Sequence, residues 1–331
     1  MDIRAKKRIH KILRLCISVA ILIFLFSRID LKTLWHHMRT ADKGLLILAL
    51  GLDFFGQFIM AWQIYLILNM RQAVIRFWNL YKIILATSFV GKFLPTSLGL
   101  DTLRMVSLAK ATRNAVTSIS SILILRVLGV ISILLFASVA VISGRYLHQS
   151  IETLLVFGLL SLIILILVMG NHRGIRRQIA RGALRIKIPE KYVQLAGDIA
   201  HSFFQFRGRP VRLGILFLLC MTYQANRVMV NFVVSESMHL GIPLGYFFLF
   251  IPVVLVLAML PLSLGGLGVR EGGKVVFLVR MGATTAQAMG VSLIVFGINL
   301  VIGLPGGIVY FLEGLSGHND EQKETVENGS P

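Results

Sequence analysis

Two arginines, Arg104 and Arg270, follow the same short motif in the two halves of the chain. The motif reads P-x-S-L-G-x4-R, and its copies begin at Pro95 and Pro261, about half of the 331 residues apart. The planar guanidinium group of arginine can bind a phosphate or carboxylate group through two parallel hydrogen bonds. A matched pair of arginines could therefore hold an anion in a cavity. The alternative interpretation of each is an arginine that snorkels or lies in a loop.

The motif also breaks a helix, because proline removes a backbone donor and glycine allows a tight turn. The N–H groups at the start of the helix after such a turn form a positive end that suits an anionic group. We therefore expect both turns to contribute to a substrate site, in addition to their structural role. The residues concerned are Pro95, Ser97, Gly99, Pro261, Ser263, Gly265, Gly266 and Gly268.

Several further charges lie beside the arginines or deep inside apolar runs. Asp101 and Glu271 flank the two arginines and could pair with them. Arg126 lies near the middle of an apolar run, where a charge is costly unless it faces the protein interior or water. Asp53 is similarly deep and could pair with an arginine, so a structural ion pair is the alternative for both. Lys92 adds a positive charge just before the first turn.

Arg227 lies nearer the end of its apolar run, and we expect it to snorkel to the surface. The eight histidines show no ligand spacing, and no Walker A, G-x-S-x-G or H-E-x-x-H pattern occurs in the sequence. We therefore expect no cofactor and no metal. Catalytic activity is left open, although no motif favours it.

The composition predicts an all-α polytopic membrane protein. Apolar residues make up 56% of the chain and charged residues 15%, which is more apolar and less charged than soluble domains. Several apolar runs are long enough, at about 18 residues, to cross a bilayer as a helix. The formal net charge of +19 has a simple explanation, because cytoplasmic loops of membrane proteins collect Lys and Arg. We favour that explanation over nucleic-acid binding.

Charge and parity predict the topology. We expect six full crossings, at about 9–27, 44–67, 116–142, 151–169, 213–234 and 285–312. The basic N-terminus and the basic loop 170–212 should face the cytoplasm, which places both termini there. Two apolar runs remain, 77–94 and 244–260. If 77–94 crossed completely and nothing returned, the loop 170–212 would lie on the wrong side.

Parity therefore favours two re-entrant hairpins, one entering from the cytoplasm and the other from outside. The alternative is that each arm spans and that the short return segment is a real crossing. Two opposed hairpins make the halves, about 9–142 and 151–312, an inverted repeat within a single membrane domain, 1–313. Paired interruptions of this kind indicate the binding site of a transporter. The polar, acidic tail 314–331 should be disordered.

The residues around both turns resemble the lysylphosphatidylglycerol synthase transmembrane-region family of flippase-like membrane proteins. The resemblance covers about 10–313, but two stretches are specific: Gly91 to Gly99 with Arg104 and Arg126, and Leu260 to Glu271. Within the second stretch, the Gly-Gly-x-Gly-x-Arg-Glu core is the most specific part.

Two departures from the family pattern concern the charged residues. The first signature usually has Gly-Glu, whereas Gly99 is followed here by Leu100 and Asp101. The crossing after the second signature often carries an arginine, whereas this chain has Ser292 in that region. We also expect no lysyl transfer by this chain alone, since it has no counterpart of the soluble synthase domain.

The resemblance implies an inner-membrane protein of a bacterium or archaeon that moves a lipid with a bulky polar or anionic headgroup. Members are associated with aminoacylated phosphatidylglycerol, hopanoids and lipid-linked sugars. The expected partners are membrane lipids, anionic ones above all, and not nucleic acid. The alternative is a non-catalytic subunit that presents a lipid-linked substrate to a separate glycosyltransferase or synthase. A membrane-embedded transferase ranks last, because only Asp53, Asp101 and Glu271 could supply its carboxylates.

Overall fold

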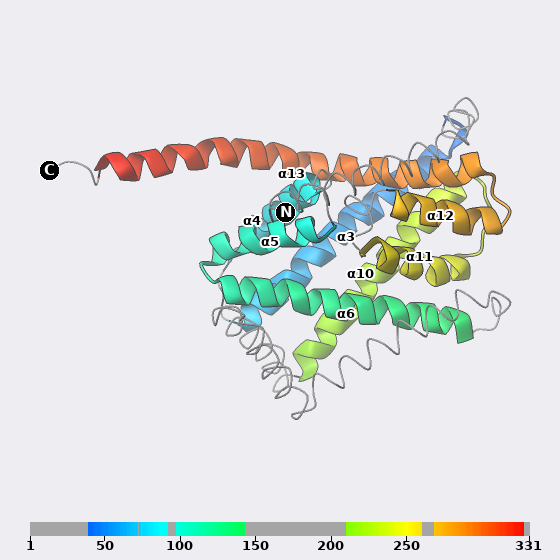
Figure 1. Cartoon of the computed structure of the whole chain (residues 1–331), viewed down its shortest axis with the longest axis horizontal. Helices are drawn as coiled ribbons and strands as arrows, with labels where there is room; N and C mark the ends of the chain where they lie inside the picture. The colour runs from blue at the N-terminus through cyan, green and yellow to red at the C-terminus, as the bar shows by residue number, and fades with distance from the viewer. Residues whose placement is uncertain are drawn as a thin grey trace, which may run out of the picture.

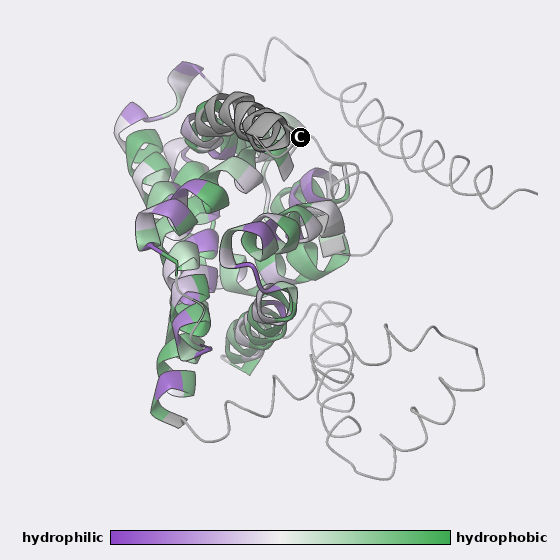
Figure 2. Ribbon diagram, turned by 90° about the vertical axis from the view of Figure 1, so that its left-hand side faces the viewer, coloured by the Kyte–Doolittle hydropathy of each residue, from purple (hydrophilic) through white to green (hydrophobic). Residues whose placement is uncertain are grey.

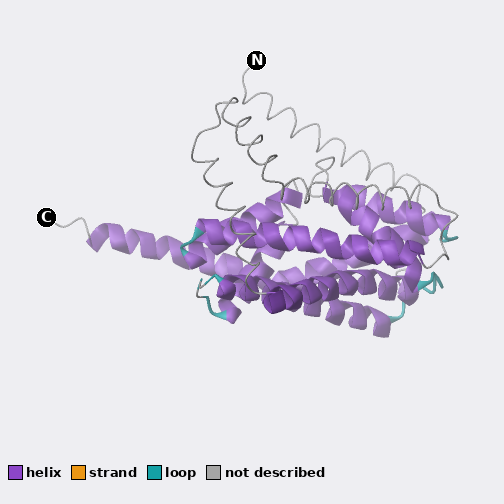
Figure 3. Ribbon diagram, turned by 90° about the horizontal axis from the view of Figure 1, so that it is seen from below, coloured by secondary structure: helices purple, strands orange, loops and turns teal. Residues whose placement is uncertain are grey.

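The computed structural model describes residues 39–71, 73, 75–91, 97–142, 210–259 and 268–327. In these ranges the regular elements are helices, joined by short loops and turns (Figure 3). They are α3 (Lys43–Met70), α4 (Phe77–Val90), α5 (Ser97–Thr112), α6 (Ala115–Ile142), α10 (Pro210–Ser237), α11 (Leu244–Met259), α12 (Val269–Arg280) and α13 (Thr285–Glu327).

Four helices in the described ranges are long and apolar enough to cross a membrane. The spans are Lys43–Met70, Ala115–Ala140, Val211–Ser237 and Thr285–Ile308. They agree with four of the predicted crossings; the other two, 9–27 and 151–169, lie outside the described residues, as does nearly all of the basic loop. Hydrophobic residues predominate along the long helices (Figure 2). Large apolar side chains face outward, as expected for contact with lipid; examples are Ile47, Phe54, Val139, Leu218 and Ile308.

The remaining helices form two pairs of short elements, α4 with α5 and α11 with α12. The apolar arms α4 and α11 have 14 and 16 residues. At 1.5 Å per residue these are about 21 to 24 Å long, which is less than the bilayer core of about 30 Å. In each pair the two helices pack against each other. The described parts of both arms are therefore shorter than the four long spans, and the re-entrant hairpins stay a prediction.

The first return helix begins earlier than the sequence suggests. We expected the turn near Pro95–Gly99 and the return segment at about 100–112. In the structure α5 already begins at Ser97, so Gly99 lies within its first turn. The second return helix, α12, begins at Val269 after Gly268.

Helices α3 and α10 pack side by side at the centre and run antiparallel (Figure 1). The bonds that join them are Asp42 N–H to the Ser237 carbonyl (2.8 Å), Asn226 Nδ2 to the Leu52 carbonyl (2.8 Å) and Gln63 Nε2 to the Leu219 carbonyl (2.9 Å). Residue numbers rise along α3 while those of its partners fall along α10. The long helices α3 and α10, which hold equivalent places in the two halves, therefore point in opposite directions.

The other helix pairings come in matched sets. Helix α4 packs on α13 and α11 packs on α6; α5 packs on α6 and α12 packs on α13. In the same way α4 contacts α3 and α11 contacts α10, while α6 contacts α10 and α13 contacts α3. Each of these pairings therefore has a counterpart in which the helices of the other half take the same places.

Glycines in α13 permit its close approach to α4. A Cβ atom at Gly306 would clash with the backbone of Leu85, and one at Gly303 or Gly307 would meet Phe89. Small residues are the usual means by which membrane helices come this close. The α4 hairpin arm is therefore held directly against the last long helix.

Helix α13 continues to Glu327 and thus includes most of the predicted tail 314–331. Its membrane-spanning part ends at Ile308. The structure describes no side chains beyond that residue, so the predicted disorder of the tail stays a prediction.

Candidate functional site

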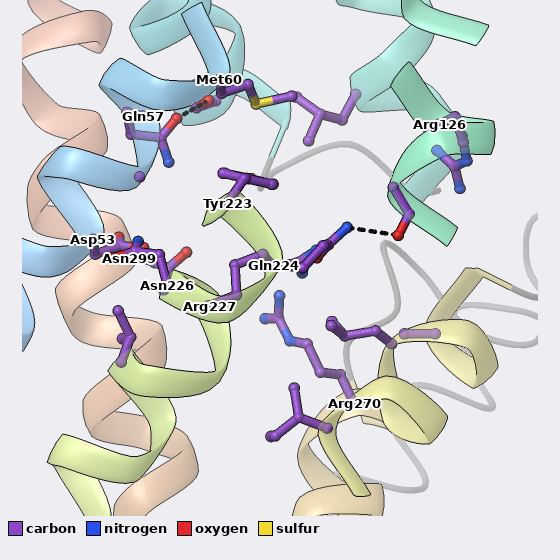
Figure 4. Close-up of a pocket in the computed structure, with 18 of the residues that line it drawn as sticks. Asp53, Gln57, Met60, Arg126, Tyr223, Gln224, Asn226, Arg227, Arg270 and Asn299 are labelled. Carbon is purple, nitrogen blue, oxygen red and sulfur yellow. Dashed lines mark hydrogen bonds between the residues drawn. The ribbon is translucent and has the colours of Figure 1, made fainter. Parts of the chain in front are cut away.

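A cavity of about 330 Å³ lies among the helices, and all eight contribute to its wall. Its charged lining among the described residues consists of Asp53, Asp101, Arg104, Arg126, Arg227, Arg270 and Lys274. Five of these side chains are basic and two are acidic, so the lining carries an excess of positive charge. In Figure 4, Arg126 and Asp53 come from opposite sides of the cavity, and Arg270 extends from α12 toward its centre.

The first charged cluster, which we call the first half-site, consists of Asp101, Arg104 and Arg126. Asp101 on α5 forms an ion pair with Arg126 on α6. Its other carboxylate oxygen lies 4.0 Å from Nη1 of Arg104, one turn further along α5. Arg104 is only 5% exposed, and its Nη2 donates to the Ser88 hydroxyl at 2.9 Å. One carboxylate therefore holds two arginines, and this cluster ties α5 to α4 and α6.

The sequence correctly places Asp101 beside Arg104. Arg126 forms its ion pair with Asp101, a partner that the sequence did not assign to it. Asp53 lines the cavity from α3, as does Gln57, which accepts a hydrogen bond from Ser88 at 3.1 Å.

The second half-site lies on α12 and consists of Arg270, Glu271 and Lys274. Arg270 donates from Nε (3.0 Å) and Nη2 (2.9 Å) to Oε1 of Glu271. The second oxygen of Glu271 accepts the Gly268 backbone N–H at 2.8 Å. Gly268 has φ 86°, in the region that favours glycine. The Gly-x-Arg-Glu sequence therefore builds one unit, in which the carboxylate caps α12 and orients the arginine.

Lys274 was not predicted from the sequence. It lies four residues after Arg270 on the same face of α12, lines the cavity and is 4% exposed. Among the described residues it forms no hydrogen bond or ion pair. Its spacing from Arg270 is the signal that could have identified it.

Helix α10 contributes a polar stripe that includes Gln224 and Arg227. Arg227 Nη1 lies 3.5 Å from the Gln224 side-chain oxygen, and its guanidinium carbon lies 5.8 Å from the centre of the Tyr223 ring. Gln224 in turn donates to the Gly129 carbonyl on α6 at 3.1 Å. The prediction that Arg227 snorkels to the surface is therefore wrong, because its side chain lines the cavity.

Several polar side chains of the two central helices, α3 and α10, line the cavity, and their positions in the sequence could have predicted this. Asp53, Gln57 and Gln63 on α3 lie four and six residues apart, and they line the cavity together with the α10 stripe. A polar stripe at helical spacing within an apolar span indicates the face that points toward protein or water.

The backbone of the turns is not part of the described site. Lys92, Pro95, Pro261, Ser263, Gly265 and Gly266 lie outside the described residues, and of Ser97 only the backbone is described. Their predicted substrate roles stay predictions. In the described part of the chain, no group of three or more His, Cys, Asp or Glu side chains could hold a metal ion.

The comparison with known families finds one that covers nearly the whole chain. The sequence model described as the lysylphosphatidylglycerol synthase TM region matches residues 11–307. The chain belongs to this family. The match includes both half-sites and all four long helices, and it confirms the resemblance that was first seen around the two turns. No curated protein matches the chain.

Membership of the lysylphosphatidylglycerol synthase transmembrane-region family indicates a membrane protein of lipid-related function. The structure also gives a physical reason for the most specific part of the family resemblance. Gly268 supplies a backbone conformation that other residues rarely adopt, and Glu271 joins the start of α12 to the guanidinium group of Arg270.

Proposed function

We propose that the protein is a lipid flippase that moves a lipid with an anionic headgroup across the cytoplasmic membrane. The observation that carries this proposal is the cavity, whose lining is predominantly basic and which lies among four helices able to span a membrane. Its volume of about 330 Å³ lies within the range of ligand pockets, about 300–1,000 Å³. The headgroup would occupy this cavity while the acyl chains remain in the bilayer.

The arrangement of the helices supports alternating access. Helices α3 and α10 are antiparallel, and the helix pairings of the two halves are matched. Both features are expected of an inverted repeat in which two re-entrant hairpins enter from opposite faces. In such transporters one half rocks against the other around a central site. Basic side chains from both halves line the cavity, so a bound anion would contact groups that move relative to each other.

The arginines of the cavity would bind the headgroup from fixed positions. Arg104 and Arg126 are held in place by Asp101, and Arg270 is held by Glu271, so these guanidinium groups are already positioned before a ligand arrives. A preorganised donor loses less freedom when it binds. The sequence contains no Walker A motif. We therefore propose that an ion gradient or the lipid asymmetry itself drives the movement of the lipid.

Reconstitution into liposomes tests this function. Purified protein should accelerate the exchange of a fluorescent anionic lipid between leaflets, and Arg270→Ala should slow that exchange about tenfold. Arg39→Ala, which changes an arginine outside the cavity lining, is the control. Binding of the lipid without any acceleration by the wild-type protein would contradict the flippase and favour a subunit that presents the lipid to another enzyme.

A further inference from the structure

The ammonium group of Lys274 is buried without a direct hydrogen bond or ion pair among the described residues. Its side chain is 4% exposed and lines the cavity, and it has no hydrogen bond or ion pair among the described residues. Burial of a charge is costly unless the charge is paired, and in folded proteins buried charges are usually paired. A cavity that keeps a buried ammonium without a partner is suited to a ligand that supplies the missing negative charge.

Two arginines of the same cavity lie on the elements around Lys274. Arg270 is one turn earlier on α12, and Arg227 lines the cavity from α10. Arg270 is partly neutralised by Glu271, whereas the hydrogen bond of Arg227 is to the neutral Gln224. The region between α10 and α12 therefore has more positive charge than its own carboxylates can balance.

The first half-site is closer to balance. Asp101 holds Arg126 in an ion pair and lies 4.0 Å from Arg104, which also donates to Ser88. Its two cations share one carboxylate and one hydroxyl. Lys274 has neither a carboxylate nor a hydroxyl as a direct partner among the described residues. The second half-site is therefore where a bound anion would compensate the most positive charge.

The charge excess also restricts the ligand. Among the described residues, and with Glu271 included, five basic groups face three acidic ones, which leaves a formal excess of two positive charges. A phosphate monoester carries about −1.5 to −2 charges at neutral pH. A headgroup that carries additional ammonium groups, as in an aminoacylated phospholipid, would bring positive charge to an already positive wall.

We propose that Lys274, together with Arg227 and Arg270, binds a phosphate group of net negative charge, and that the ligand is a phosphate monoester or diphosphate rather than an aminoacylated phospholipid. That this ligand is a lipid which the protein transports rests on the proposed function. The phosphate site itself does not, because the protein could bind such a ligand without moving it.

Binding measurements on the full chain in detergent test this inference separately from transport. The probes are a short-chain diacylglycerol phosphate, inorganic phosphate and short-chain lysylphosphatidylglycerol. The wild-type protein should bind the lipid phosphate at least about tenfold more tightly than lysylphosphatidylglycerol. Equal affinity for the two lipids would overturn the assignment. Inorganic phosphate that binds as tightly as the lipid phosphate would assign the site to free phosphate instead of a lipid.

A matched set of variants assigns the effect to Lys274. Lys274→Met keeps the length of the side chain without its charge and should weaken binding of the lipid phosphate about tenfold or more, whereas Lys274→Arg should retain most of it. The exposed Lys110, on α5 outside the cavity lining, provides the control Lys110→Met, which should bind normally. Unchanged binding by Lys274→Met would remove Lys274 from the site. If the methionine variant does not fold, Lys274→Gln provides the same comparison.

Discussion

The two halves of the chain carry the same motif but use its charges differently. In the first half-site, Asp101 pairs with Arg126 across α5 and α6 and lies close to Arg104, which also binds Ser88. In the second, Glu271 holds Arg270 on the same helix, and Lys274 has no partner among the described residues. The first set of contacts joins three helices, whereas the second stays within α12 and does not include Lys274.

We propose that the two copies of the motif have different roles. The P-x-S-L-G-x4-R motif places an arginine in each half of the cavity, but the surrounding residues decide what each arginine does. An acid three residues before Arg104 can also reach the neighbouring helix, while the acid directly after Arg270 caps its own helix. We therefore expect the first half-site to stabilise the wall of the cavity and the second to recognise the proposed substrate.

Removal of the shared carboxylate should have the largest effect on stability. Asp101→Asn leaves Arg104 and Arg126 with no counter-charge in the first half-site, and loss of one partner of a buried ion pair costs about 3–5 kcal/mol. Because the Asp101 side chain is 16% exposed, we expect about 3 kcal/mol, seen as a lower thermal unfolding temperature in detergent. Asp42→Asn keeps a capping side chain on α3 and serves as the control. A normal unfolding temperature for Asp101→Asn would show that the first half-site does not stabilise the fold.

Neutralisation of Lys274 should change stability in the opposite direction. Lys274→Met removes a buried charge that has no direct partner among the described residues. The free energy of unfolding of the ligand-free variant should therefore be about 1–3 kcal/mol higher than that of the wild type. Thermal unfolding of the two proteins without added lipid measures this. Destabilisation of similar size to that of Asp101→Asn would indicate that Lys274 has a structural role like that of the first half-site.

The hydroxyl of Ser88 should contribute least. Ser88→Ala removes the 2.9 Å bond to buried Arg104, and hydrogen bonds to charged groups contribute about 1.5–3 kcal/mol. We expect the lower end of that range, since Asp101 remains. The same unfolding assay applies, with Ser107→Ala on α5, outside the cavity lining, as the control. A Ser88→Ala variant that unfolds like the wild type would leave Asp101 as the main support of Arg104.

The duplicated motif pointed to Arg104 and Arg270, which both line the cavity, and hydropathy predicted the four long helices of the described residues. Sequence did not give the partner of Arg126, because Asp101 reaches it only when α5 packs on α6. Arg227 was misplaced because its distance from the end of the apolar run says nothing about which face points inward. Lys274 was missed because it lies beyond the motif, although it shares a helix face with Arg270.

The most direct measurement compares lipid exchange in liposomes that contain the wild-type protein, Lys274→Met or Lys110→Met. Each is assayed with a fluorescent lipid phosphate monoester and with fluorescent lysylphosphatidylglycerol. We predict that the wild-type protein and Lys110→Met move the lipid phosphate faster than the aminoacylated lipid, and that Lys274→Met loses this activity. Equal rates for both lipids, or an unchanged rate in Lys274→Met, would contradict the assignment of the second half-site to an anionic headgroup.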